Sequence, residues 1–405
     1  MSPSTAPQAG HAPGLWGERR EAGLFRRLDS FFSPCIVANA MKRAEMIRAP
    51  IPMGGKMIRE LFSSMAAASV LGLAVSALLP GAASAQEVTL RVHSFLPPQG
   101  TVPSQFLEPW AERVMEQSDG RINVEVYHSM SLGGAPGALF DQVREGVVDI
   151  AWGLPGWTPG RFPMAETFEL PFMVGHAEAS SRALWRFYEA HLTDEFADVH
   201  MLAMNVHGPG MFHMNAPAIE SPADLEGRAV RGPTRLTTRL IEAMGGTAIG
   251  MPVTQIPESL QRNVIDGAII PWEVTRALRV AELVDTHTEI AGDRSLYTTA
   301  FFFAMNREAY EDMPEDLRAV IDANSGAETS AWIGRVMQEA DAPGREAAVE
   351  AGNTIVTIEG AALAEWVARA EPVRAGWIAE MAERGIDAEA LIADAERLVE
   401  EELAR

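Results

Sequence analysis

The amino-acid sequence predicts an α/β fold built as two domains, each a sheet flanked by helices. The first observation is a regular alternation of strand and helix patterns between residues 88 and 152. The second is the turn sequence His207-Gly208-Pro209-Gly210, after which the alternation begins again. With 405 residues, 47% of them apolar, the chain is long enough to form one or two domains with hydrophobic cores.

The first predicted domain follows a β-α-β-α-β order, which is typical of a parallel sheet covered by helices. Period-two alternation marks the strands, and apolar residues three or four apart mark the helices. The predicted strands cover residues 88–95, 121–127, 148–152 and 201–206, and the predicted helices cover residues 102–116, 139–147 and 177–192.

The second predicted domain repeats this pattern, and the chain then returns to the first domain near Tyr297. Its predicted strands cover residues 212–215, 229–231, 247–251 and 267–270, and its predicted helices cover residues 234–244 and 256–263. Residues 297–306 are aromatic and apolar, and helical patterning runs from residue 317 to 349 with few breaks. Residues 363–403 are predicted to form amphipathic helix with acidic faces, as a solvated outer layer.

Domain I is therefore assigned to residues 86–207 plus 296–337, and domain II to residues 208–295 plus 338–405. A ligand cleft is expected between them.

Residues 57–85 have the layout of a signal peptide: a charged start, an apolar middle, and Ala83-Ser84-Ala85 as a cleavage site. A transmembrane anchor is the alternative, but a span needs about 20 consecutive apolar residues, and this run contains small and polar residues and Pro80. Residues 1–56 fit neither a signal peptide nor a domain. We interpret them as an upstream extension that is disordered or not translated, with translation starting at Met53 or Met57.

Cleavage after Ala85 would leave a strongly acidic chain without lysine or cysteine. Both lysines and Cys35 precede the cleavage site, and the remainder has 24 arginines against 50 acidic residues, a net charge of −26. A chain without cysteine suits an oxidising compartment such as the periplasm. The negative charge argues against nucleic acid as a partner and against insertion of the mature chain into a membrane, because phosphate groups would repel the chain.

Motifs for catalysis and for cofactor or metal binding are missing from the sequence: it has no H-E-x-x-H, G-x-S-x-G or C-x-x-C. Four histidines (His93, His128, His207 and His213) are scattered along the chain. The glycines at 133, 134 and 137 match no phosphate-binding loop and are interpreted as a tight turn. We therefore predict no enzyme activity, no cofactor and no metal, with a secreted enzyme on the same scaffold as the alternative.

Arg231 is the strongest candidate for a binding residue. It ends a short predicted strand and precedes Gly232-Pro233, which places it at the edge where open α/β sheets bind ligands. A guanidinium group binds a carboxylate through two parallel hydrogen bonds. The alternative is a surface arginine in a loop. Aromatic residues end other predicted strands and are candidates for the same cleft: Phe95, Trp152, Phe212 and Trp272.

Several segments together resemble the substrate-binding proteins of TRAP transporters, of the DctP type. They are Leu132-Gly133-Gly134, residues 143–150, Glu169-Leu170-Pro171-Phe172, Asp224-Leu225-Glu226-Gly227, Val230-Arg231 and Ile265-Asp266-Gly267. The resemblance covers nearly all of residues 86–400. It implies a two-domain periplasmic binding protein with hinge strands and one long connecting helix. Such a protein captures a small organic acid, a monocarboxylate or dicarboxylate, and delivers it to TRAP membrane permease subunits.

The resemblance assigns the carboxylate-binding arginine to Arg231, but the sequence departs from the family pattern elsewhere. A second arginine is often present where this chain has Gly208-Pro209-Gly210, and an amide where it has Ile269-Ile270. These differences favour a ligand with one carboxylate and a less polar remainder. A ligand-sensing role for a receptor is a further alternative to transport.

Two other residues have two interpretations each: Trp272 contacts the ligand or covers the hinge, and Glu273 accepts a hydrogen bond from a ligand hydroxyl or ammonium or binds a backbone amide. Tyr297, at the return crossing, is a candidate to donate a hydrogen bond from its phenol to the carboxylate. The predicted ligand-binding residues are Arg231, Trp272, Trp152, Phe212, Tyr297, Phe95 and Glu273. Arg235 and Arg239 on the following helix are expected to face solvent.

Overall fold

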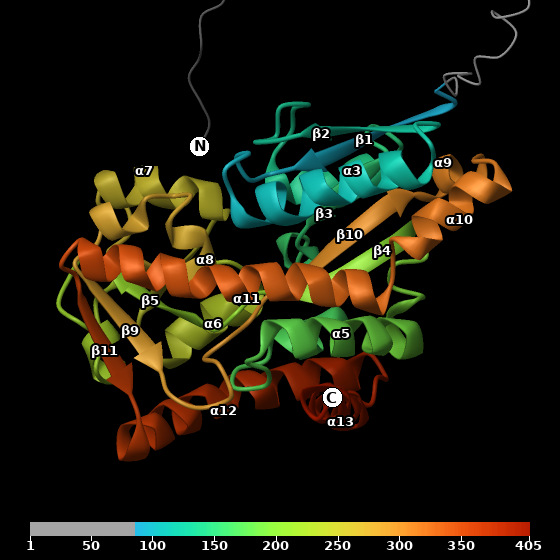
Figure 1. The fold of residues 1–405 in the computed structure, drawn as a ribbon. Helices are drawn as coiled ribbons and strands as arrows, with labels where there is room; N and C mark the ends of the chain where they lie inside the picture. The colour runs from blue at the N-terminus through green and yellow to red at the C-terminus, as the bar shows by residue number, and fades with distance from the viewer. Residues whose placement is uncertain (1–85) are drawn as a thin grey trace, which may run out of the picture. The chain divides into compact units, whose positions relative to one another are not determined.

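The computed structural model describes residues 86–405, which lie in one compact unit. Two mixed sheets flanked by helices make up this part of the chain (Figure 1), so the predicted α/β class is confirmed. The interpretations of residues 1–56 as an upstream extension and of residues 57–85 as a signal peptide lie outside the described residues.

The first sheet has the strand order β2-β1-β3-β10-β4. β1 pairs in parallel with β2 and β3, whereas β10 runs antiparallel to β3 and β4. Helices α3, α4 and α5 pack against β2, β3 and β4. The bounds are β1 Val88–Ser94, β2 Ile122–Tyr127, β3 Ile150–Gly153, β4 Val199–Val206, β10 Ala300–Asn306, α3 Glu108–Gln117, α4 Leu139–Arg144 and α5 Ala177–Phe187.

The second sheet has the strand order β11-β9-β5-β8-β6-β7. β6 pairs in parallel with β7 and β8, while β5 runs antiparallel to β8 and β9. The bounds are β5 Gly210–Met214, β6 Ala229–Gly232, β7 Thr247–Gly250, β8 Gly267–Pro271, β9 Thr286–Ile290, β11 Thr354–Ile358, α6 Arg235–Ala243, α7 Ile256–Gln261 and α8 Trp272–Thr275.

The chain crosses between the sheets through two short segments, residues 207–209 and 291–299, and a third time along helix α11 (Ala327–Glu350), which lies between β10 and β11. All strands of the first sheet come from residues 86–207 and 296–337, and all strands of the second come from the remaining described residues. The exact domain boundaries stay a prediction. Both short segments join paired strand ends. Val206 at the end of β4 pairs with Ala300 at the start of β10, and Gly210 at the start of β5 pairs with Pro271 at the end of β8. The two sheets therefore turn these edges towards one another.

Helix α11 (Ala327–Glu350) packs against α5 beside the first sheet and against α8 beside the second (Figure 1). Two glycines permit this close approach. A Cβ atom on Gly334 would lie 2.4 Å from the Ala177 carbonyl oxygen, and one on Gly344 would lie 2.1 Å from the Trp272 carbonyl oxygen. Only glycine fits where two backbones come so close. The long connecting helix is thus fixed to both halves by backbone contact.

The predicted helix over residues 317–349 is two helices, α10 (Glu315–Ala323) and α11. The break falls at Asn324–Gly326, where Gly326 has a φ of +90° and the Asn324 carbonyl accepts a hydrogen bond from the Trp110 indole. A positive φ ends a helix and favours glycine. The short α9 (Arg307–Glu311) precedes α10.

The expectation that residues 363–403 form a solvated outer layer is wrong in part. These residues form α12 (Gly360–Glu383) and α13 (Ala388–Leu403), which carry acidic outer faces but also bury large side chains. Trp366 and Trp377 of α12 are fully buried, and α13 packs against α5. Because these stretches are rich in acidic residues, their sequence did not indicate that one face of each helix belongs to the core.

Strands β9 and β11 were not predicted, because their sequences mix polar and apolar residues without the clear alternation seen elsewhere. No helix within residues 86–405 combines the length and the hydrophobicity that a membrane crossing would need.

Candidate functional site

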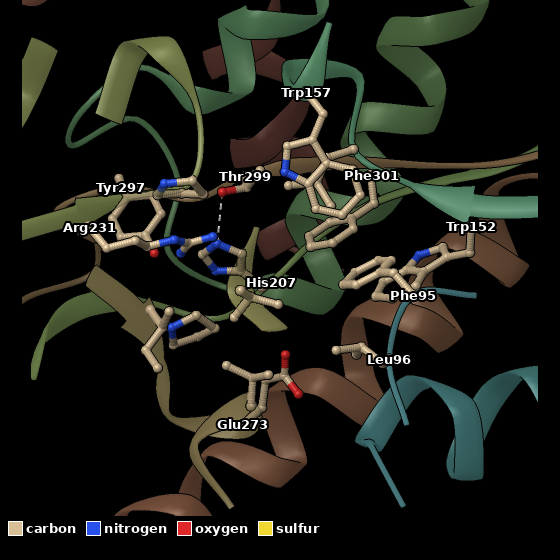
Figure 2. Close-up of a pocket in the computed structure, with 16 residues that line it drawn as sticks. Phe95, Leu96, Trp152, Trp157, His207, Arg231, Glu273, Tyr297, Thr299 and Phe301 are labelled. Atoms are coloured by element: carbon tan, nitrogen blue, oxygen red, sulfur yellow. Dashed lines mark hydrogen bonds between the residues drawn. The ribbon is translucent and has the colours of Figure 1, made fainter. Parts of the chain in front are cut away.

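A cavity lies where the facing edges of the two sheets meet (Figure 2). Its lining combines the ends of β1, β3, β6 and β8, the start of β10, and both crossing segments. The lining residues are Phe95, Leu96, Trp152, Leu154, Trp157, His207, Arg231, Pro233, Val253, Ile270, Pro271, Glu273, Val274, Tyr297, Thr299 and Phe301.

Arg231 provides the positive charge of this cavity. Its side chain is 2% exposed, and carbonyl oxygens hold it: Nε donates to Met251 (2.8 Å) and Nη1 donates to Ile269 (3.2 Å). No carboxylate among residues 86–405 pairs with it, and Nη2 has no hydrogen-bond partner there. Burial lowers the pKa of Arg231 to about 10, so the group remains charged at neutral pH. A buried cation of this kind strongly favours an anion beside it.

Neutral hydrogen-bonding groups surround the guanidinium group. The Nδ1 atom of His207 lies 2.5 Å from the Gly208 carbonyl oxygen, to which it can only donate. Its Nε2 atom therefore accepts the hydrogen bond from the Thr299 hydroxyl at 3.1 Å, drawn in Figure 2. Burial, together with the charge of Arg231, lowers the pKa of His207 to about 4, so the ring is neutral. Burial also raises the pKa of the Tyr297 phenol, which stays protonated and able to donate.

Gly210, at the end of the first crossing, has no room for a side chain. A Cβ atom at this position would lie 2.0 Å from Cε1 of Tyr297. The backbone amide of Gly210 donates to the Tyr297 carbonyl oxygen at 3.1 Å, which fixes the two residues against each other. The Tyr297 ring thus occupies the space that a side chain at residue 210 would need.

One wall of the cavity is a stack of aromatic rings. The ring of Trp152 lies between Phe95 (4.9 Å between centroids, 9° between planes) and Phe301 (4.8 Å, 2°). Trp157 contacts Phe95 edge-on at 4.8 Å. The Trp152 indole donates to the Asn205 side chain at 3.2 Å, which fixes the orientation of the central ring. Flat apolar rings of this kind favour a planar ligand.

Glu273 is the acidic residue of the cavity. Its side chain is 5% exposed, and its Oε2 atom is buried without a hydrogen-bond partner. The backbone amide of Glu273 donates to Oδ1 of Asp341 on α11 at 2.9 Å. Burial, with the charge of Asp341 adding to it, raises the pKa of Glu273 to about 8. Figure 2 shows its carboxyl group pointing into the cavity near Leu96.

Five of the seven predicted binding residues line the cavity, and two lie elsewhere. Trp272 packs against His213 and His287, and its indole donates to Glu289 at 2.8 Å. Phe212 packs against Trp366 in the core of the second half. The structure therefore places both side chains outside this cavity, and we leave them out of the proposed site.

Sequence reasoning missed Trp157, Thr299 and Phe301 and treated His207 as one of several scattered histidines. Thr299 lies near Tyr297 on the return crossing, Phe301 follows at the start of β10, and β10 begins at the edge where β3 ends. An antiparallel strand brings its first residues to that edge, so the direction of β10 was the signal that could have identified them.

The expectation that Arg235 faces solvent is wrong. Arg235 pairs with Glu166, which lies between β3 and β4 of the first sheet. The Nη1 atom of Arg235 donates to Glu380 of α12 at 2.6 Å. The Trp377 indole donates to Glu166 at 3.1 Å. Arg239 is partly exposed and pairs with Glu380 at 2.5 Å. These contacts tie α6 of the second half to the first half beside the cavity. Within residues 86–405, no three His, Asp or Glu side chains gather as a metal site would require.

Comparison with known proteins adds to this geometry. Residues 93–380 match the family described as bacterial extracellular solute-binding protein, family 7, or DctP.

Three solved structures are similar to the chain. A TRAP solute-binding protein from Rhodoferax ferrireducens T118, in complex with copurified benzoate, is 44% identical, with 78% of this chain and 98% of that one covered and a TM-score of 0.77. A marine metagenome TRAP solute-binding protein specific for aromatic acid ligands, in complex with 3-hydroxybenzoate, is 41% identical, with 78% and 99% covered and a TM-score of 0.77. One from Bordetella bronchiseptica, with bound (R)- and (S)-mandelate, is 26% identical, with 77% and 99% covered and a TM-score of 0.72.

Proposed function

Because the chain belongs to the DctP family of bacterial extracellular solute-binding proteins, we propose that it captures a small aromatic carboxylate. This is a solute-binding family and not an enzyme family. Three similar proteins bind benzoate, 3-hydroxybenzoate and mandelate, each of which combines one carboxylate with an aromatic ring.

The observation that carries the proposal is that Arg231 and the aromatic stack line the same cavity. The guanidinium group is buried, charged and without an acidic partner among the described residues, so a ligand carboxylate would complete it. The rings of Phe95, Trp152 and Phe301 lie parallel to one another and offer an apolar surface for the remainder of the ligand. Neither feature alone selects this ligand class, but together they fit a planar acid.

Binding is proposed to take place in the periplasm, with delivery to the membrane subunits of a TRAP permease. The family supports both statements, and the signal-peptide pattern of residues 57–85 supports the first. Closure of the two halves on the ligand would bury the carboxylate against Arg231, since both halves line the cavity.

Calorimetric titration with benzoate tests this function through the substitution Arg231→Ala. The variant is expected to bind benzoate at least a hundredfold more weakly, because the ligand carboxylate would be buried without its charged partner. Arg262→Ala is the matched control: it removes an arginine of the same half, exposed on the surface and paired with Glu258.

Unchanged affinity in the Arg231 variant would remove this residue from the site. Binding of aliphatic acids in preference to every aromatic acid tested would overturn the aromatic class while leaving carboxylate binding intact.

A further inference from the structure

Glu273 is an unusual residue to find in a cavity built for an anion. Its Oε2 atom is buried and has no hydrogen-bond partner among residues 86–405. Its carboxyl group points into the same cavity that Arg231 lines, yet the two form no ion pair. A buried carboxyl group without a partner destabilises a protein unless something else satisfies it.

The protein holds Glu273 in this position through its backbone. The residue lies in the first turn of α8, its amide donates to Asp341, and its carbonyl oxygen accepts from the Thr101 hydroxyl at 3.4 Å. α8 in turn packs against Gly344 of α11. The carboxyl group is therefore positioned from both halves of the molecule.

We propose that Glu273 determines specificity by accepting a hydrogen bond from a hydroxyl group that the ligand carries away from its carboxylate. This inference rests on the proposed function. It narrows the ligand to a hydroxylated aromatic acid, with Arg231 binding the carboxylate, the stacked rings packing against the aromatic ring, and Glu273 binding the hydroxyl.

The chemistry of the cavity favours a hydroxyl over other substituents. A second carboxylate would be buried beside Glu273 with no second arginine among the described residues of the cavity lining to pair with it, which disfavours dicarboxylates. A hydroxyl both donates and accepts, so it pairs with the Glu273 carboxyl group in either protonation state, whereas a methoxy group only accepts and can pair with the protonated form alone.

Arg276 offers the competing explanation. It lies three residues further along the chain and lines a separate outer hollow together with Glu273, although the two form no ion pair in the structure. If Glu273 served only to pair with Arg276, its replacement would affect all ligands alike.

Binding of benzoate, 3-hydroxybenzoate, 4-hydroxybenzoate and the matching methoxybenzoates should be measured by calorimetry for the protein and for Glu273→Met. Methionine has a similar size but no strong hydrogen-bonding group. At least one hydroxybenzoate is expected to bind tenfold or more tightly than benzoate, and the substitution should remove that preference. Benzoate affinity should change less than threefold.

Glu339→Gln is the control, because it removes an exposed acid of α11 that lines the outer hollow but not the cavity. It should leave the preference intact. Equal losses for benzoate and hydroxybenzoates in Glu273→Met, or no hydroxybenzoate binding more tightly than benzoate to the unmodified protein, would overturn the inference. Failure of every aromatic acid to bind the unmodified protein would instead overturn the proposed function.

Discussion

Two clusters of buried polar side chains in the second half of the molecule differ in whether the protein satisfies them. In the histidine cluster (His213, His287 and Asn353), His213 Nε2 bonds the Ile270 carbonyl oxygen at 3.1 Å, and its Nδ1 bonds His287 Nδ1 at 2.7 Å. His287 Nε2 bonds the Asn353 amide at 3.0 Å. Every ring nitrogen has a partner. In the cavity, Nη2 of Arg231 and Oε2 of Glu273 have none among the described residues.

The difference distinguishes the structural polar groups of the histidine cluster from the open groups of the cavity. Because unsatisfied buried polar atoms are costly, open atoms that also line a cavity are candidates for binding a ligand. Trp272 illustrates this. Its indole hydrogen bond goes to Glu289 and its ring packs on the histidine cluster, so it belongs to the satisfied region.

The largest expected effect comes from breaking the satisfied cluster. Replacing His213 with leucine would leave the Nδ1 atom of His287 and the Ile270 carbonyl oxygen buried without partners. We expect the free energy of unfolding to fall by about 2–4 kcal/mol, measured by urea denaturation.

Among the molecules that remain folded, benzoate affinity should stay within threefold of the unmodified protein. Arg231→Ala is expected to show the reverse pattern, with affinity lost and stability kept. If His213→Leu abolished binding in fully folded protein, the distinction between the two clusters would be wrong.

The two clusters should also respond to pH with opposite signs. Burial lowers the pKa of His213 to about 3 and of His287 to about 4, against about 6.5 in an unfolded chain. The unfolded state then binds more protons, so stability from this cluster falls as pH drops from about 6.5 towards 4. Glu273 has a pKa of about 8 in the folded protein, against about 4.3 in an unfolded chain. Its contribution to the free energy of unfolding is therefore complete below about pH 4.3 and is lost as the pH rises through 8.

Melting temperatures of the ligand-free protein between pH 4.5 and 8.5 test this. Glu273→Gln should reduce the loss of melting temperature between pH 6 and 8.5, whereas Glu339→Gln should not. Identical alkaline profiles for the unmodified protein and Glu273→Gln would contradict the buried, proton-holding state of this carboxyl group.

The smallest expected effect is that of Trp272→Phe. The ring keeps most of its packing and loses the hydrogen bond to Glu289, so the free energy of unfolding should fall by about 1 kcal/mol. Hydroxybenzoate affinity should change less than twofold in calorimetric titration. A tenfold loss of affinity would return Trp272 to the binding site.

The sequence predicted Arg231 because its position depends on local features: a short β-branched strand, then Gly232-Pro233 at the carboxyl edge of a parallel sheet. The assignment of Trp272 and Glu273 depends on one residue of register. Both follow Pro271 in the first turn of α8, and successive helical side chains point about 100° apart, so only the structure decides which one faces the cavity.

The histidine cluster could not be predicted, because its members come together only through tertiary packing. His213 and His287 are 74 residues apart, and strand β9, which carries His287, was itself missed. The strands of the first sheet were easier to predict, since their alternation of hydrophobic residues is regular and helices separate the first three of them.

The contact between Gly210 and Tyr297 constrains the order in which these two positions can change during evolution. Any other residue at 210 would meet the tyrosine ring at 2.0 Å, and the hydrogen bond between the two backbones leaves little room for retreat. A lineage that gains a second arginine here must first shrink residue 297, losing the buried phenol before any new charge appears. An arginine at position 210 would thus require two substitutions, made in that order.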